Sequence, residues 1–384
     1  MRWKNFWAAT NRACAKTVDL TRIAGLFAFP GRLVTIKPIG SGNVNDTYLA
    51  VFRTHFSEEL GIIQRINRQV FKNPSWIVEN MRVVTEHVHQ RLEREADTAD
   101  RIWQLPRLVP IRDGGDFYRD EAGDCWRAMT VIASAASYDR AQGPEHAFEV
   151  GTVLGQFHRL LSDLDPARLR DTLPGFHVAP LYLKAYDVTL QEASGSERLR
   201  ASAEAKRLQR FIEARRGLAD VLESALDRNE LKLRLIHGDP KVNNIMIDNL
   251  TGKGTSIVDL DTVKPGLIHY DFGDALRSIC NSAGEEVQDL AGVHFDLDLC
   301  ETFVKGYMAY ARDFLTEKDR AYLYDSIRLI AFELGLRFFQ DYLAGNVYFK
   351  VRYPEHNLQR ARVQLRLCES IETREAMIRK ALEH

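Results

Sequence analysis

The chain has 384 residues, which is near the upper limit for one hydrophobic core, so two lobes or domains are expected. Hydrophobic residues make up 45% and charged residues 27%, a composition that excludes wholesale disorder, a collagen-like repeat and an integral membrane protein. Lys and Arg number 52 against 53 Asp and Glu, which gives a formal net charge of -1. Because such a chain has no overall basic field, no nucleic-acid partner is expected.

The cysteines and the hydropathy pattern favour a cytoplasmic protein. Five cysteines are scattered along the chain without a CxxC pair, which argues against a disulfide framework and a thiolate zinc site. Residues 1–10 lack the continuous apolar core of a secretory signal, and no run of roughly 18 apolar residues occurs. We therefore expect a protein of the reducing cytoplasm with no membrane partner.

The first third of the chain has the pattern of a β-sheet with one helix. Short runs rich in β-branched and aromatic residues predict strands at 33–36, 47–52 and 62–66. Helical spacing then predicts a helix at 74–96, and the strand pattern returns at 117–118 and 126–132. The apolar stripe of this helix consists of Ile77, Met81, Val84, Val88 and Leu92.

Helices dominate after a stretch of small residues at 133–137, which has the pattern of a hinge. Helical spacing predicts one helix that ends at Leu161 and a long charged helix at 196–229. Two apolar runs on either side of 249–255 predict a β-hairpin.

These elements predict an α+β fold of two lobes. The first is a small, β-rich lobe at 1–134, of which residues 1–30 form an extension. The second is a larger, mainly helical lobe at 135–384.

A polar cluster at the predicted hairpin carries the chemistry. His237, Asp239 and Asn244 lie in the segment His-Gly-Asp-Pro-Lys-Val-Asn-Asn, and Asp259 follows the second strand. In a hairpin, Asn244 at the start of the first strand and Asp259 at the end of the second lie at the same end. An amide oxygen and a carboxylate are ligands suited to Mg²⁺, and phosphate oxygens would complete its shell. Asp239, on the preceding loop, can accept the proton of an attacking hydroxyl.

This HxDxxxxN pattern, with Asp259 on the next strand, resembles the motif of the aminoglycoside phosphotransferase and choline kinase superfamily, which has the protein-kinase-like fold. Within that superfamily the chain most resembles the N-acetylhexosamine 1-kinases, from about residue 20 to about residue 370. The resemblance implies ATP and Mg²⁺ as cofactors and the anomeric hydroxyl of an N-acetylhexosamine as the acceptor. Supporting stretches lie at 40–48, 64–67, 176–177, 259–262, 337–342 and 348–350.

Carried over position by position, the resemblance implies that Asp239 is the catalytic base and that His237 supports its loop. It implies that Asn244 and Asp259 bind Mg²⁺ and that Asp261 assists as an outer or second-metal ligand. The acceptor pocket would contain Arg337, Tyr348 and His177.

The nucleotide is expected between the lobes. A glycine-rich turn can bring backbone N–H groups close to phosphates, and the hinge offers backbone groups to the adenine. The residues expected there are Gly40, Ser41, Gly42 and Asn43 in the turn and Thr130 and Ile132 at the hinge.

A cation on the third strand should also reach the phosphates. Kinases carry a Lys there, whereas this chain offers Arg65. The usual helical partner of that cation is a Glu, yet Glu79 and Glu86 lie off the apolar stripe and Asn80 lies on it. The sequence leaves this ion pair open.

Several polar residues have a structural interpretation beside the functional one. The segments 271–273 and 252–254 resemble a kinase metal motif and a P-loop, but their positions favour structural roles. Lys241 is interpreted as solvent-exposed, Arg277 as the partner of Asp274 or Asp271, and His177 alternatively as a buried histidine satisfied by backbone.

Charge guides the choice of acceptor. Cations outnumber acids in 337–366, which disfavours cationic acceptors and favours a neutral sugar. Two alternatives stay open. One is a kinase of an amino alcohol, a homoserine-like molecule or an aminoglycoside; the other is a non-catalytic nucleotide-binding protein, since the strand Lys is missing.

Overall fold

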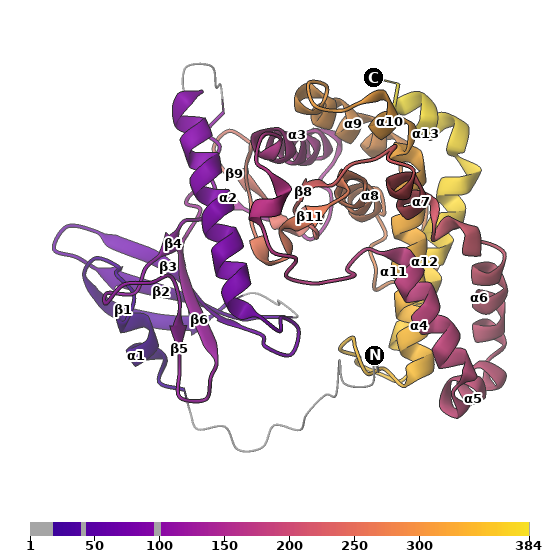
Figure 1. Cartoon of the computed structure of the whole chain (residues 1–384), viewed down its shortest axis with the longest axis horizontal. Helices are drawn as coiled ribbons and strands as arrows, with labels where there is room; N and C mark the ends of the chain where they lie inside the picture. Colours follow the sequence, from indigo (N-terminus) through magenta and orange to yellow (C-terminus); the bar gives the residue numbers. More distant parts are fainter. Residues whose placement is uncertain (1–17, 40–43, 96–100, 384) are drawn as a thin grey trace.

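A computed structural model describes residues 18–39, 44–95 and 101–383. These residues form a part built on a sheet, at the left of Figure 1, and a larger helical part, at the right. Helix α2 (Pro74–Arg94) lies between the two parts. This arrangement confirms the predicted α+β fold with a β-rich first part and a helical second part.

The first part is an antiparallel sheet with the strand order β1-β2-β3-β6-β4, and β5 also pairs with β6. Side chains alternate between the two faces of each strand. One face packs with α1 (Leu20–Gly25) around Phe52, Ile63 and Trp126, which are almost fully buried. The strands are β1 (Arg32–Pro38), β2 (Asp46–Arg53), β3 (Glu58–Ile66), β4 (Leu108–Val109), β5 (Tyr118–Arg119) and β6 (Cys125–Thr130).

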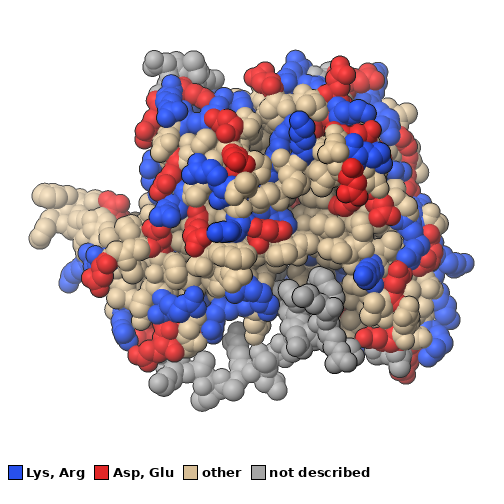
Figure 2. Space-filling view, in the orientation of Figure 1, with Lys and Arg blue, Asp and Glu red and all other residues tan. Residues whose placement is uncertain are grey.

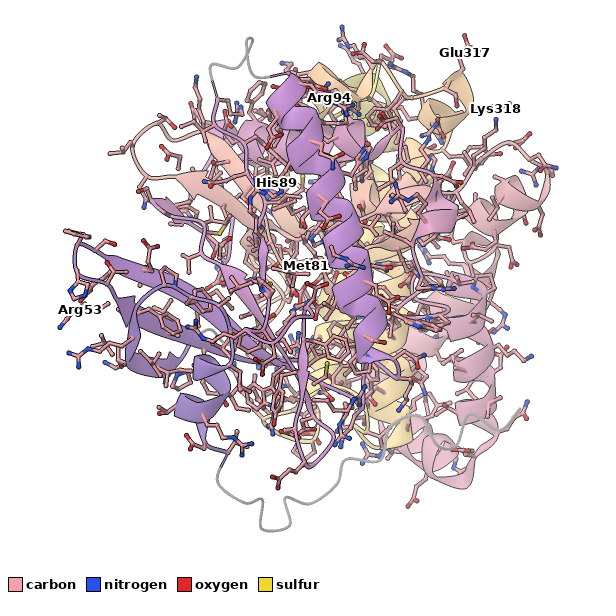
Figure 3. The ribbon with its side chains drawn as sticks, turned by 60° about the vertical axis from the view of Figure 1, so that its left-hand side comes forward. Arg53, Met81, His89, Arg94, Glu317 and Lys318 are labelled. Carbon is pink, nitrogen blue, oxygen red and sulfur yellow. The ribbon has the colours of Figure 1, made fainter. Side chains whose placement is uncertain are left out.

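Helix α2 connects the cores of the two parts. Its predicted apolar stripe is buried at Ile77, Met81, Val84 and Val88. Ile77 packs with the sheet residues Ile66 and Cys125, whereas Met81, labelled midway along α2 in Figure 3, belongs to the core of the helical part.

The helical part is organised around buried helices. Helix α8 is buried along almost its whole length, and α3 crosses α9 at very short distance. At that crossing a Cβ atom on Gly151 would lie 2.1 Å from the carbonyl oxygen of Phe303, so only glycine fits there. The helices are α3 (Pro144–Leu161), α4 (Ala179–Gln191), α5 (Ala193–Ala201), α6 (Ala203–Glu213), α7 (Val221–Asp227), α8 (Ile268–Ile279), α9 (Leu297–Ala311), α10 (Glu317–Ala321), α11 (Leu323–Ala344), α12 (His356–Thr373) and α13 (Glu375–Ala381).

Two small antiparallel sheets lie within the helical part and carry the polar cluster. The predicted hairpin is confirmed as β9 (Ile245–Asp248) paired with β10 (Gly254–Ile257), and β7 (Ala135–Ala136) joins β9. Strand β8 (Arg234–Ile236) pairs with β11 (Lys264–Gly266). The loop from β8 to β9 and the turn from β10 to β11 therefore meet, because each joins one small sheet to the other.

Some predicted elements differ from the structure. The long helix predicted at 196–229 is wrong: Ser202 is extended (φ -120°, ψ 121°) and its side chain caps α6 by accepting the N–H of Ala205, which separates α5 from α6. A short 3-10 turn at Arg216–Leu218 separates α6 from α7. Helix α4 was not predicted. Residues 271–273 lie inside α8 rather than before a helix.

The surface carries charges of both signs. Lys and Arg side chains alternate with Asp and Glu over both parts on the face shown in Figure 2. Among the described residues, no helix combines the length and the apolar character that a membrane span requires. Cys125, Cys280, Cys300 and Cys368 are buried free thiols, and Cys14 lies outside the described residues.

Candidate active site between the sheet and the helical part

The loop from β8 to β9, residues 237–244, is called the catalytic loop below. A buried carboxylate fixes its start: Asp271 on α8 accepts the backbone N–H groups of His237 (2.6 Å) and Gly238 (2.8 Å). His158 Nε2 lies 2.9 Å from the same carboxylate. Burial raises the pKa of Asp271, but the hydrogen bond and charge of His158 outweigh it, so the pKa stays below its ordinary value. Asp271 is therefore an anionic anchor, which agrees with its structural interpretation.

The imidazole of His237 ties the catalytic loop to the hairpin. Its Nδ1 accepts the N–H of Asp239 at 3.2 Å, so its Nε2 carries the proton and donates to the carbonyl of Val258 at 2.9 Å. Complete burial lowers the pKa of His237, which keeps the ring neutral. This is the geometry of a support rather than of a reacting group.

The carboxylate of Asp239 lies at the accessible end of the loop, with 31% of its side chain exposed. Lys241 Nζ lies 2.6 Å from Asp239 Oδ2 while 38% of its side chain is exposed, so Lys241 is accessible to solvent, as expected, and also pairs with the proposed base. The preceding Gly238 has φ +86°, and a Cβ atom there would lie 2.8 Å from the carbonyl oxygen of Thr262. A glycine is required because the loop passes this close to the turn that carries Asp259.

Asn244 and Asp259 lie at the same end of the hairpin, as its register requires. Ile245 pairs with Ile257, and the N–H of Val258 donates to the carbonyl of Asn244 at 2.8 Å. The side-chain N–H of Asn244 donates to the carbonyl of Asp239 at 2.7 Å. The amide oxygen of Asn244 is therefore the atom that can ligate a metal.

Asp259 begins the segment 259–262, called the metal turn below. Its backbone is left-handed (φ 67°, ψ 57°), an unusual conformation for a residue other than glycine. Although Asp259 keeps accessible surface, desolvation by the surrounding protein and the charges of Asp261 and Asp239 raise its pKa. A divalent cation would relieve this repulsion. The oxygen donors of Asn244 and Asp259 thus fit Mg²⁺.

Asp261 has a different set of partners from those of a metal ligand. Its Oδ1 is ion-paired with Arg127 on β6, and its Oδ2 accepts the side-chain N–H of Asn45 at 2.6 Å. Both oxygens are thus occupied by protein donors, and the side chain is 4% exposed. We therefore assign Asp261 to contacts with the sheet and leave it out of the proposed metal site.

The expectation that Arg65 reaches the phosphates is contradicted by the strand geometry. Arg65 shares a face with Ile63, the face that packs with α1, and not the face toward α2. Its Nε donates to Asp46 Oδ2 at 2.9 Å, and its Nη1 lies 3.3 Å from Asp124 Oδ2. The neighbouring Gln64 occupies the face toward α2.

Of the remaining predicted nucleotide residues, the structure describes Thr130 and Ile132. Residues 40–43 are outside the described part of the chain. Thr130, at the end of β6, accepts the N–H of Arg107 through its hydroxyl at 2.9 Å, and Ile132 is buried where the chain crosses toward β7. Asn80 on α2 bonds the carbonyls of Arg170 (2.7 Å) and Val263 (3.0 Å) rather than a cation.

The three predicted acceptor residues are linked in one chain, in which His177 is buried and Tyr348 is exposed. His177 Nε2 lies 2.8 Å from the carbonyl of Gly238, and its Nδ1 lies 3.1 Å from Glu333 Oε1. Arg337 follows at 3.6 Å from Glu333, and the ring of Tyr348 lies 5.9 Å from its guanidinium. This chain runs from the catalytic loop into the helical part.

Both ring nitrogens of His177 face an oxygen, an arrangement that suits the charged imidazolium, which donates from both. Burial lowers the pKa of His177, but the charge of Glu333 outweighs burial and raises it. Among the described residues, Glu333 Oε2 is buried without a hydrogen-bond partner. An acceptor hydroxyl could satisfy it.

Sequence reasoning missed Arg127 and Glu333. Each had a signal, because each is a lone charged residue in an apolar run, Cys-Trp-Arg-Ala-Met and Ile-Ala-Phe-Glu-Leu-Gly-Leu. Buried charges in such runs are paired or functional. Arg277 is paired with Asp274 (2.8 Å), one of the two partners expected for it.

Similar structures share the fold over nearly the whole chain. A microcompartment-associated aminopropanol kinase is 17% identical, with a TM-score of 0.57 and coverage of 94% of this chain and 97% of the other. An aminoglycoside phosphotransferase from Alicyclobacillus acidocaldarius is 14% identical, with a TM-score of 0.54 and coverage of 97% and 98%. A choline kinase from Cryptosporidium parvum is 13% identical, with a TM-score of 0.53 and coverage of 91% of both chains.

At such low identity these likenesses show the kinase-like fold alone. The sequence profile of the phosphotransferase enzyme family matches residues 35–299, which include the catalytic loop and the metal turn. The match covers more than half of the chain, so the chain belongs to the phosphotransferase enzyme family, as the resemblance in its motif indicated.

Proposed function

We propose that the protein is an ATP- and Mg²⁺-dependent kinase that transfers the γ-phosphoryl group to a hydroxyl of a small molecule. Residues 1–134 would bind the nucleotide and residues 135–384 the acceptor, in the cytoplasm. The observation that carries the proposal is the convergence of Asp239, Asn244 and Asp259, since Asn244 bonds Asp239 at 2.7 Å and pairs with Val258, next to Asp259.

In the proposed reaction Asp239 orients the acceptor hydroxyl and takes its proton as the phosphoryl group is transferred. Lys241, at 2.6 Å, holds one oxygen of Asp239 and leaves the other for the hydroxyl. Asn244 and Asp259 would hold Mg²⁺, which neutralises charge on the triphosphate when bound. Thr130 and Ile132 at the hinge and residues 40–43 are proposed to contact the nucleotide.

The first candidate acceptor is an N-acetylhexosamine, phosphorylated at its anomeric hydroxyl. It is supported by the sequence resemblance and by the chain that joins His177 and Arg337, with Tyr348 beside it, to the catalytic loop. The free Glu333 Oε2 gives a sugar hydroxyl an acceptor at the same place.

The charge argument from 337–366 does not contribute. Arg360 pairs with Glu286, Arg362 with Glu204 and Arg366 with Glu369, so these cations are engaged with other side chains. Whether a neutral or a cationic acceptor is favoured therefore depends on the groups near Asp239.

An amino alcohol is the second candidate, because acids gather near the base. Asp274 is buried, and both this burial and the charge of Asp239 raise its pKa. A cationic acceptor would be stabilised by these carboxylates, of which Asp274 pairs with Arg277 and Asp239 with Lys241.

An ADP-release assay with ATP and Mg²⁺ tests the proposal across N-acetylglucosamine, N-acetylgalactosamine, choline, an aminopropanol, homoserine and kanamycin. Asp239→Asn should lower kcat by about 10²–10⁴-fold. The matched control is Asp248→Asn at the exposed hairpin turn, which should keep its rate. Turnover with N-acetylhexosamines alone supports the sugar, and turnover with amino alcohols alone replaces it. Nucleotide binding without turnover of any acceptor would favour a non-catalytic protein.

A further inference from the structure

A buried arginine crosses from the sheet to the metal turn. Arg127 on β6 has 1% of its side chain exposed and forms an ion pair with Asp261. The same guanidinium donates to Gln64 Oε1, at 2.7 Å from Nη2 and 3.1 Å from Nε. Separating two opposite charges that are both buried is strongly unfavourable. The pair therefore fixes the metal turn to the sheet.

A second contact from the sheet side holds the other oxygen of Asp261. Asn45 donates its side-chain N–H to Asp261 Oδ2 at 2.6 Å and accepts the backbone N–H of Asn67 at 3.0 Å. On the helical side, Thr172 Oγ1 donates to the backbone carbonyl of Asp261 at 2.9 Å. We call Arg127, Gln64, Asn45 and Asp261 the clamp.

The strand register explains why this cation comes from β6. Gln64 and Arg127 are direct partners in the pairing of β3 with β6 and lie on the face toward α2, where Arg127 Nη1 is 3.8 Å from the sulfur of Met81. Protein kinases present a Lys from the third strand at the boundary of the two lobes. In this chain an uncharged Gln64 stands on that face of β3, and the adjacent strand supplies the positive charge.

The clamp acts on the metal site through one short turn. Asp259 precedes Asp261 by two residues, and Thr262 in the same turn donates its hydroxyl to the carbonyl of His237 at 2.8 Å. The metal turn is thus fixed between the sheet on one side and the catalytic loop on the other. Its left-handed residue, Asp259, thus lies at the start of a turn that is held on both sides.

We propose that Arg127 is a positioning residue that sets Asp259 for the metal and nucleotide by acting through Asp261, without itself binding phosphate. The inference rests on the proposed function, since it assigns Asp259 to the metal of a kinase. Arg127 would thus place a buried cation at the boundary of the two parts, where kinases have the strand Lys, but its partner is Asp261 and not a phosphate.

The test measures Mg²⁺-dependent binding of a fluorescent ATP analogue. The readout is the Mg²⁺ concentration at which binding is half-maximal, called the Mg²⁺ midpoint below. Arg127→Met should raise that midpoint by about 10–100-fold, the cost of losing support behind a metal ligand. Arg127→Lys, which keeps the charge but not the fork of donors, should fall between. Asp261→Asn should reproduce Arg127→Met, and the double variant should be no worse than either single variant.

Arg101→Met is the matched control. Arg101 also forms a partly buried ion pair between the loop before β4 and helix α3, with Nη2 at 3.1 Å from Glu149 Oε1 and 14% of its side chain exposed. It contacts Gly254 at the start of β10, the end of that strand opposite to the metal turn. In urea unfolding, Arg101→Met should lose about as much stability as Arg127→Met. Its Mg²⁺ midpoint should equal that of the unmodified protein.

The outcomes separate the two proposals. A wild-type midpoint in Arg127→Met, or effects of Arg127→Met and Asp261→Asn that add in the double variant, would overturn the role through Asp261. If Arg127→Met does not fold, the double variant, which leaves no lone buried charge, gives the same answer. Absence of Mg²⁺-dependent nucleotide binding in the unmodified protein would overturn the proposed function itself, and this inference with it.

Discussion

The catalytic loop and the metal turn are fixed in different ways. The loop is held entirely within the helical part, by Asp271 and by His177. The metal turn is held across the boundary, by Arg127 and Asn45 of the sheet part. A movement of the sheet would leave the base in place but displace the turn. The position of the base is thus a property of one part, whereas the position of the proposed metal depends on both.

The largest effect is expected at Asp271, the buried anion that accepts two backbone N–H groups of the catalytic loop. Asp271→Ala leaves two backbone N–H groups and Nε2 of His158 without their partner, which should cost about 3–5 kcal/mol of unfolding free energy. It should also lower kcat by about 100-fold through displacement of Asp239. Urea unfolding and the ADP-release assay measure the two quantities.

Asp248→Ala is the control for this change, since Asp248 caps the exposed turn of the same hairpin. It should cost about 1 kcal/mol and leave kcat unchanged. Equal losses in the two variants would mean that the catalytic loop does not depend on its anchor.

The support of the loop should also respond to pH. Tyr270, which stacks on His177 with ring centroids 5.5 Å apart, donates its hydroxyl to Glu223. Burial raises the pKa of Glu223 from 4.5 to about 7. Between these values the unfolded chain releases the proton that the folded protein keeps. The unfolding free energy should therefore fall as pH rises through this window, by up to about 3 kcal/mol.

Urea unfolding at about pH 5 and about pH 7.5 measures this fall, and Glu223→Gln should remove that part of it. The same pH dependence in the variant and in the unmodified protein would show that Glu223 titrates normally in the folded state.

A smaller effect is expected on the acceptor side of the loop. Glu333→Gln removes the charge that pairs with His177, with Arg337 at 3.6 Å, while it keeps the shape. The acceptor KM should rise about tenfold and the ATP KM should change by less than about twofold. Steady-state kinetics with each substrate varied make this separation. Glu317→Gln, on the exposed helix α10, is the control, and a rise in the ATP KM alone would contradict the assignment.

The smallest effect is expected at Arg65. Its guanidinium is partly exposed and paired with Asp46 and Asp124 on the face away from α2. Arg65→Met should therefore change the ATP KM by less than about twofold, as for other exposed ion pairs. A tenfold rise would return Arg65 to the phosphates and weaken the comparison between loop and turn.

The parts of the site that sequence could predict are local. Residues 237–259 span one loop and one hairpin, so the alternation of apolar and polar residues and the turn residues between the strands predict their register. Helix α2 is predicted by its apolar stripe. The prediction of one long helix at 196–229 is wrong because Ser202 caps a new helix there, despite the helical composition of the segment.

The clamp is not local, which is why it was missed. Gln64, Arg127 and Asp261 meet only once β3 pairs with β6 and the sheet packs over the metal turn. Alternation correctly put Ile63 and Arg65 on one face, but which face meets α2 is decided by packing across the whole chain. The assignment of Asp261 to the metal has the same origin, because its partners Arg127 and Asn45 come from elements far away in the sequence.

The amide at position 64 has a practical consequence for chemical labelling. Acylating nucleotide analogues modify an amine beside the bound phosphates, and protein kinases offer theirs from the third strand. Strand β3 has no Lys here, so a survey of cellular kinases by such reagents would find no reactive amine on that strand. The amine of Lys241 lies 2.6 Å from the proposed base. Desolvation lowers the pKa of Lys241, but the charge of Asp239 outweighs it and raises that pKa, so the amine would stay protonated and react poorly with such a reagent.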